Sequence, residues 1–70
     1  MKHKLYIARR ERRLRQKDVA KMLHIDPQTY HLKEAGKRDF TLKEAKKLTT
    51  IFNMTLDELF GDEESYGAAS

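Results

Sequence analysis

Cysteine is absent from this 70-residue chain, which excludes disulfides and cysteine-based metal sites. The three glycines are isolated at positions 36, 61 and 67, so the chain has no glycine-rich phosphate loop. No apolar run approaches the roughly 20 residues that a membrane-spanning helix needs, and the basic first residues lack the apolar stretch of a signal peptide. We therefore expect a soluble, cytoplasmic protein without a membrane partner.

Residues able to perform catalysis are equally scarce. The only serines, Ser65 and Ser70, lie close to the end of the chain. His3, His24 and His31 have neither the spacing of metal ligands nor a pair of carboxylates on a shared face. The sequence therefore predicts a protein that is not an enzyme and that has no metal, cofactor or small-molecule ligand.

Charge is distributed unevenly along the chain. All 15 lysines and arginines lie at or before Lys47. Residues 1–38 hold twelve of them against four acids, a net charge of +8, whereas residues 39–70 hold three against seven, a net charge of −4. A basic half of this kind is expected of a surface that binds phosphate, although surplus lysine and arginine also serve solubility alone.

Apolar spacing predicts helices throughout, and no segment alternates like a strand, so the expected fold class is all-α. The first helix should stop near Arg13. A second begins at Gln16, a turn follows at residues 24–26, and a third runs from Pro27 to about Ala35, with Asp26 as its N-cap and Gly36 after it. The expected core residues of these segments are Leu5, Ile7, Ala8, Val19, Ala20, Met22, Leu23, Ile25 and Tyr30.

Two later helices have capping-box signals, with threonine at the cap and glutamate three residues on. The boxes span residues 41–44 and 55–58. The fourth helix should bury Leu42, Ala45, Leu48 and either Ile51 or Phe52 and end at Asn53, and the fifth should bury Leu56, Leu59 and Phe60. Residues 61–70 are expected to form a flexible acidic tail after a single domain at residues 1–60.

The ordered set of segments resembles the phage Cro/repressor (XRE-like) helix-turn-helix family over about residues 4–60. The residues that carry the resemblance are Leu14, Gln16, Ala20, Leu23, Ile25, Thr29-Tyr30, residues 34–38 (EAGKR) and residues 53–60 (NMTLDELF). The resemblance implies a compact five-helix, lambda-repressor-like DNA-binding domain. It also implies a homodimer on a pseudo-palindromic operator in double-stranded DNA, acting as a transcriptional repressor or switch.

Three positions depart from the family's pattern. The family usually has glycine where this chain has Arg13 and His24, and non-glycine residues with positive φ cost roughly 1–2 kcal/mol. The end of the first helix or the turn is therefore expected to be shaped differently here. Lys33 stands where an apolar residue often packs inward, so its stem should cover the core while its ammonium group reaches solvent or phosphate.

Within the third helix, the N-terminal part should face the base edges of the major groove. Helical phase places Tyr30 toward the second helix and leaves four expected base-reading residues outside: Gln28, Thr29, His31 and Leu32. Gln28 suits adenine, and His31 could donate to guanine or a phosphate. Leu32 either meets thymine methyl groups or, if the helix is rotated slightly, is buried in place of Lys33.

Phosphate contacts are expected at the N-terminus of the second helix and after the third. The residues assigned to them are Arg15, Gln16, Lys17, Lys37 and Arg38, with Arg10 and Arg13 extending the patch. The family resemblance implies that Arg9 and Glu34 form a partly buried ion pair. That pair is a structural feature rather than a DNA contact.

The leading interpretation is a sequence-specific DNA-binding regulator, and two alternatives stay open. One is an antitoxin-type or partner-binding module that binds DNA only within a protein complex. The other is a helical bundle that binds proteins without DNA, against which the charge asymmetry argues. Self-association is expected at the apolar ends of the last two helices, formed by Ile51, Phe52, Met54 and Phe60, together with Tyr66.

Overall fold

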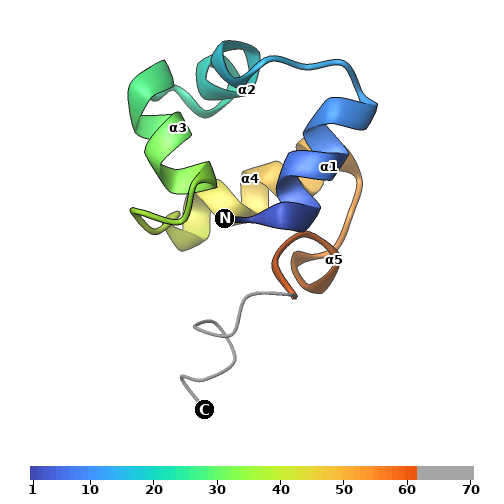
Figure 1. Cartoon of the computed structure of the whole chain (residues 1–70). Coiled ribbons are helices and arrows are strands. Elements are labelled where there is room, and N and C mark those ends of the chain that lie inside the picture. Colours follow the sequence, from blue (N-terminus) through green and yellow to red (C-terminus); the bar gives the residue numbers. More distant parts are fainter. Residues whose placement is uncertain (62–70) are drawn as a thin grey trace.

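The computed structural model describes residues 1–61, and within them helices are the only regular secondary structure. Five helices follow one another around a shared centre (Figure 1): α1 (His3–Glu11), α2 (Gln16–Leu23), α3 (Pro27–Glu34), α4 (Leu42–Phe52) and α5 (Leu56–Phe60). The predicted all-α, five-helix class is therefore confirmed. The predicted tail lies outside the described residues except for Gly61.

The helices pack so that α2 lies against α3 and α1 against α5, while α4 contacts both α2 and α5 (Figure 1). Every helix contributes to the single core, whose buried apolar residues are Leu5, Ala8, Val19, Ala20, Leu23, Tyr30, Leu48, Phe52, Leu59 and Phe60. Phe40, in the segment after α3, stacks at a tilt between the rings of Tyr30 and Phe60, with centroid distances of 5.8 Å to each. This core holds α2 and α3 in a fixed relation.

Helix starts follow the predicted capping residues. The hydroxyl groups of Thr41 and Thr55 accept hydrogen bonds from the backbone N–H of Glu44 and Glu58, and both glutamates accept in return from the threonine N–H. Asp26 caps α3 by accepting from the N–H of Gln28 at 2.9 Å. These bonds satisfy N–H groups that have no partner within their own helix.

Three residues predicted to be in the core are instead exposed: Ile7 by 51%, Met22 by 40% and Leu42 by 63%. Helical phase explains the difference. In α4 the buried stripe runs through Ala45, Leu48 and Phe52, and Leu42 lies roughly 90° away from its centre at about 100° per residue. An apolar residue at the edge of a stripe thus faces solvent despite its hydrophobicity.

The predicted self-association surface is also wrong in part. Phe52 and Phe60 are buried in the core of their own chain, with 0% and 8% exposure. Ile51 and Met54 are half-buried against the same core, and Tyr66 lies outside the described residues. The apolar ends of α4 and α5 therefore close the core instead of presenting a free face.

The backbone is left-handed at both positions where the resemblance led us to expect glycine. Arg13 has φ of 56° and His24 has φ of 60°. The expected change of shape did not occur, because these residues adopt the conformation that glycine favours. The cost of positive φ is smaller for histidine than for most other residues, so the strain is concentrated at Arg13.

We expect Arg13→Gly to stabilise the protein by about 0.5–1 kcal/mol, because relief of strain exceeds the added entropy of the unfolded chain. His24→Gly should change the free energy of unfolding by less, because histidine tolerates this conformation. Chemical denaturation of both variants and the wild type gives the comparison. Destabilisation by Arg13→Gly would show that the arginine side chain contributes more than its backbone costs.

Lys33 also differs from prediction. Its side chain is buried, as expected of the stem, but its ammonium group donates to Oε1 of Glu44 at 2.6 Å and lies 5.9 Å from the ring centre of Phe40. The charge is therefore neutralised by α4 instead of reaching solvent or phosphate. Leu32 is half-buried, so it does not replace Lys33 in the core.

Candidate nucleic-acid interface

One face of α3 is open to solvent while the other packs on the core. Gln28 and His31 are exposed, Thr29 and Leu32 are half-buried, and Tyr30 is fully buried toward the core. Asp26 and Pro27 fix where this helix begins, because the first caps it and the second occupies its first position. The four predicted base-reading residues thus come from one short helix with a defined start.

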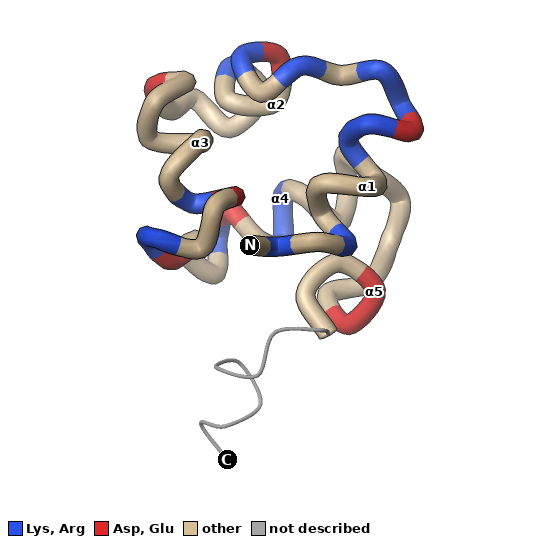
Figure 2. Tube along the Cα trace, in the orientation of Figure 1, with Lys and Arg blue, Asp and Glu red and all other residues tan. Residues whose placement is uncertain are grey.

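Basic residues gather on two segments of the chain, one leading into α2 and one following α3 (Figure 2). Figure 2 shows one of them running from the end of α1 through the connection into the start of α2, and the other in the loop after α3. Four of the predicted phosphate-binding residues on these segments are exposed: Arg15, Lys17, Lys37 and Arg38. By contrast, α5 carries only acidic charge among its residues.

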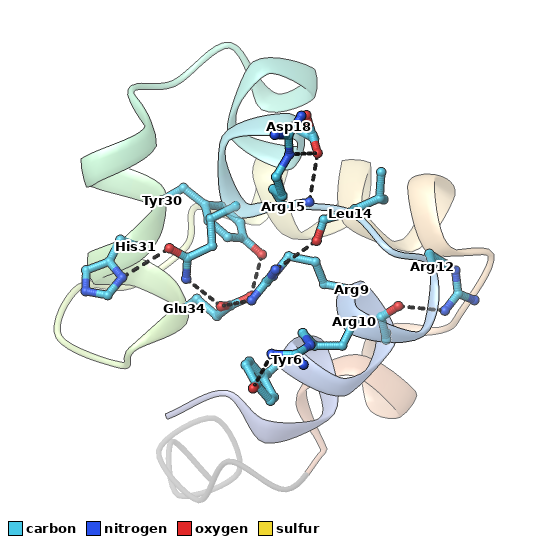
Figure 3. Close-up of polar contacts among 12 residues, drawn as sticks. Tyr6, Arg9, Arg10, Arg12, Leu14, Arg15, Asp18, Tyr30, His31 and Glu34 are labelled. Atoms are coloured by element: carbon cyan, nitrogen blue, oxygen red, sulfur yellow. Dashed lines mark hydrogen bonds and ion pairs between the residues drawn. The ribbon is translucent and has the colours of Figure 1, made fainter.

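Gln16 is the exception among the predicted phosphate contacts. It is half-buried, and its amide is already occupied at both ends. Nε2 donates to Oε1 of Glu34 at 2.7 Å, and Oε1 lies 3.2 Å from Nδ1 of His31 (Figure 3). Only its backbone N–H at the start of α2 remains in the predicted place for a phosphate.

Glu34 is the centre of a buried polar cluster that joins three helices (Figure 3). Arg9 of α1 approaches it with two nitrogens, Nε at 2.9 Å and Nη2 at 3.1 Å. The hydroxyl group of Tyr30 donates to Oε2 at 2.8 Å, and Gln16 supplies the fourth donor. The ion pair that the resemblance implied is confirmed and ties α1 to the last turn of α3, while the hydrogen bond from Gln16 ties α2 to the same turn.

The cluster fixes the ionisation of its members. Burial alone would raise the pKa of Glu34, but the hydrogen bonds from Arg9, Gln16 and Tyr30 outweigh burial and hold that pKa below its ordinary value. Burial, reinforced by the charge of Glu34, raises the pKa of Tyr30 far above its ordinary value. Glu34 is therefore a carboxylate at neutral pH, and Tyr30 is a neutral hydroxyl that donates.

Several supporting contacts were not predicted from the sequence. Nη1 of Arg9 donates to the carbonyl of Leu14 at 2.8 Å, which fixes the chain just before α2. Arg12 donates to the carbonyl of Phe52 at 2.7 Å and lies over its ring, so it closes the end of α4. These two arginines donate to carbonyl groups whose positions depend on the tertiary fold. No pattern in the sequence predicts such contacts.

One missed contact did have a local signal. Asp18 accepts from the backbone N–H of Arg15 at 2.8 Å and from its Nε at 3.4 Å. An acid three residues after a helix start is the second half of a capping box, here without a threonine or serine as its partner. The pair lowers the pKa of Asp18, chiefly through the backbone hydrogen bond.

Residues 1–61 contain no group of three histidine, aspartate or glutamate side chains that could hold a metal ion. None of the five helices within that range has the length and hydrophobicity needed to cross a bilayer.

Comparison with known protein families identifies the arrangement. The pattern of the helix-turn-helix family matches residues 5–59, which include all of α2 to α4 and nearly all of α1 and α5. No curated protein and no solved structure matched the chain. The match covers most of the sequence, and the structure has the two packed helices and tight turn that define the motif. The chain therefore belongs to the XRE type of the helix-turn-helix family, whose members are DNA-binding regulators.

Proposed function

We propose that the protein is a sequence-specific transcriptional regulator that places α3 in the major groove of double-stranded DNA. The observation that carries the proposal is the exposed face of α3, which is tied to α1 and α2 by the Glu34 cluster and accompanied by exposed cations at the start of α2 and in the loop after α3. A rigid helix accompanied by such cations can lie in the groove while the cations contact the phosphates.

Base reading would come from Gln28, Thr29, His31 and Leu32. The amide of Gln28 has the two groups needed to pair with N6 and N7 of one adenine. Thr29 offers a methyl group and a hydroxyl group, and the half-exposed Leu32 suits the methyl group of thymine. Direct readout by such residues gives specificity, because each base pair shows a distinct pattern in the major groove.

Phosphate contacts would come from Arg15 and Lys17 at the start of α2 and from Lys37 and Arg38 after α3. The backbone N–H of Gln16 would add a donor at the helix N-terminus. These contacts carry no sequence information, but they fix the register of the protein on the duplex. It follows from this proposal that the protein acts on a bacterial or phage chromosome and hence in the cytoplasm.

A dimer on a pseudo-palindromic operator completes the proposal. One α3 presents only four reading residues, so a single copy would recognise too short a site to be selective in a genome. Two copies would place their α3 helices in successive major grooves, roughly 34–36 Å apart. A compact protein seated in this way would block access to a promoter, which favours repression of the genes next to its operator.

Gln28→Ala tests the reading face. We expect it to relax the preference at one symmetric pair of operator positions by roughly 1–3 kcal/mol, because the bidentate contact to adenine is lost. Binding to unrelated DNA should hardly change. Selection of bound duplexes from random DNA, with wild type and variant in parallel, gives the preference at every position.

Leu32→Ala serves as the matched comparison on the same helix. It should act at a different, thymine-rich position and have a smaller effect, since it removes only an apolar contact. If Gln28→Ala instead weakened all sequences equally, Gln28 would be a backbone contact and the assigned reading face would be wrong.

A further inference from the structure

The amide of Gln16 lies between two side chains of α3, the buried Glu34 and the exposed His31. It joins the carboxylate of Glu34 to the ring of His31, at 2.7 Å and 3.2 Å respectively. A residue of α2 thus contacts a base-reading residue directly. Which group donates and which accepts in these two hydrogen bonds decides which imidazole nitrogen of His31 carries the hydrogen.

Glu34 sets the orientation of the Gln16 amide. An ionised carboxylate can only accept hydrogen bonds, and its other two partners, Arg9 and Tyr30, are donors. Gln16 must therefore turn its NH₂ group toward Glu34. The amide oxygen is then left facing Nδ1 of His31.

The orientation of the Gln16 amide in turn determines the tautomer of His31. An amide oxygen has no hydrogen to donate, so Nδ1 of His31 must carry one for this bond to form. In a neutral imidazole one nitrogen donates and the other accepts, and a hydrogen bond at one of them selects the tautomer. Nε2 lies across the exposed ring from Gln16, and in this tautomer it has a free lone pair.

We propose that Gln16 holds His31 in the Nδ1–H tautomer, so that Nε2 of His31 reads an exocyclic amine as a hydrogen-bond acceptor. In the major groove such amines are N6 of adenine and N4 of cytosine. This assignment rests on the proposed function, and it reverses the donor role toward guanine expected from the sequence. Gln16 becomes a positioning residue for base recognition instead of a side-chain phosphate contact.

The tautomer can be measured on the free protein. The ¹⁵N spectra of the histidine rings are recorded at about pH 8, above the reference histidine pKa of about 6.5. In these spectra the chemical shift of Nε2 distinguishes a nitrogen without hydrogen from a protonated one. We expect a bare Nε2 in wild-type His31. In Gln16→Met, which keeps the length but removes the amide, the hydrogen should move mainly to Nε2.

Two controls accompany this measurement. Gln28→Met removes the other glutamine amide of the chain, which is not the hydrogen-bond partner of His31 Nδ1, and should leave the tautomer of His31 unchanged. Gln16→Ala repeats the test should methionine disturb the packing around Glu34, and thermal melts report whether each variant is folded. A protonated Nε2 in the wild type, or signals unchanged in both folded Gln16 variants, would overturn the assignment.

Selection of duplexes from random DNA tests the reading role. The operator position read by His31 is the one whose preference disappears in His31→Ala. Wild type should favour adenine or cytosine there by roughly five- to tenfold, and Gln16→Met should lose that preference or change it to guanine. An unchanged preference in Gln16→Met would overturn the role of Gln16 in reading while leaving the proposed function intact. Absence of duplex binding by the wild type would overturn both the reading role and the proposed function, and the ring signals would still decide the tautomer.

Discussion

Glu34→Ala should abolish most of the folded population at room temperature. Glu34 is 1% exposed and receives four hydrogen bonds from three residues, so its removal leaves the buried guanidinium of Arg9 without its partner. Removing one side of a buried ion pair costs about 3–5 kcal/mol. That cost is comparable with the whole stability of a domain of this size. Circular dichroism and chemical denaturation measure the loss.

Glu34→Gln gives the graded comparison, with an expected loss of roughly 1–3 kcal/mol because the amide keeps the shape but not the charge. Glu11→Gln removes the same charge from an exposed site on α1 and should stay within about 0.5 kcal/mol of wild type. Melts of Glu34→Gln that coincide with wild type would contradict the buried cluster.

Acidification should reveal the same carboxylate. The pKa of Glu34 is lowered on folding, so its contribution is fully present above the unfolded value of about 4.3 and is lost as the pH falls through the folded value. The difference in stability between wild type and Glu34→Gln should therefore shrink below about pH 4. A difference that stayed constant into stronger acid would exclude this linkage.

DNA binding should depend steeply on salt. Arg15 and Lys17 at the start of α2 and Lys37 and Arg38 after α3 are exposed, and each phosphate they neutralise releases counterions. For a dimer making six or more such contacts, affinity should fall about 10³-fold or more between roughly 50 and 200 mM salt. Titrations by fluorescence anisotropy at several salt concentrations give the slope.

Lys37→Ala should weaken binding to all sequences alike and reduce the slope by about one for each subunit bound. Lys47→Ala makes the same change of charge at an exposed site on α4, outside the proposed interface, and should leave the slope nearly unaltered. Equal effects of the two substitutions would mean that net charge, and not the two basic segments, governs binding.

Local signals in the sequence predicted the helix boundaries well. Thr41 with Glu44, Thr55 with Glu58, and Asp26 with Pro27 each act within a few residues, so the structure they specify does not depend on the rest of the fold. The all-α class followed from the same kind of pattern.

Contacts between distant residues could not be predicted in this way. The ammonium group of Lys33 meets Glu44 of α4 because the two helices approach each other, and nothing near Lys33 in the sequence indicates this. The amide of Gln16 was assigned to phosphate for the same reason, since its link to Glu34 and His31 requires α2 and α3 to be placed first. Composition and spacing predict which face of a helix is apolar. Ion pairs and hydrogen bonds between helices depend on how the helices pack.

Competition between two duplexes tests the central claim most directly. One duplex carries the site selected from random DNA, and the other carries the same base pairs in scrambled order, so that their phosphate charge is identical. At physiological salt the full chain should prefer the selected duplex by about 10³-fold or more, because in the proposed function α3 reads base edges. Equal affinity for the two duplexes, or no binding to either, would contradict a sequence-specific regulator.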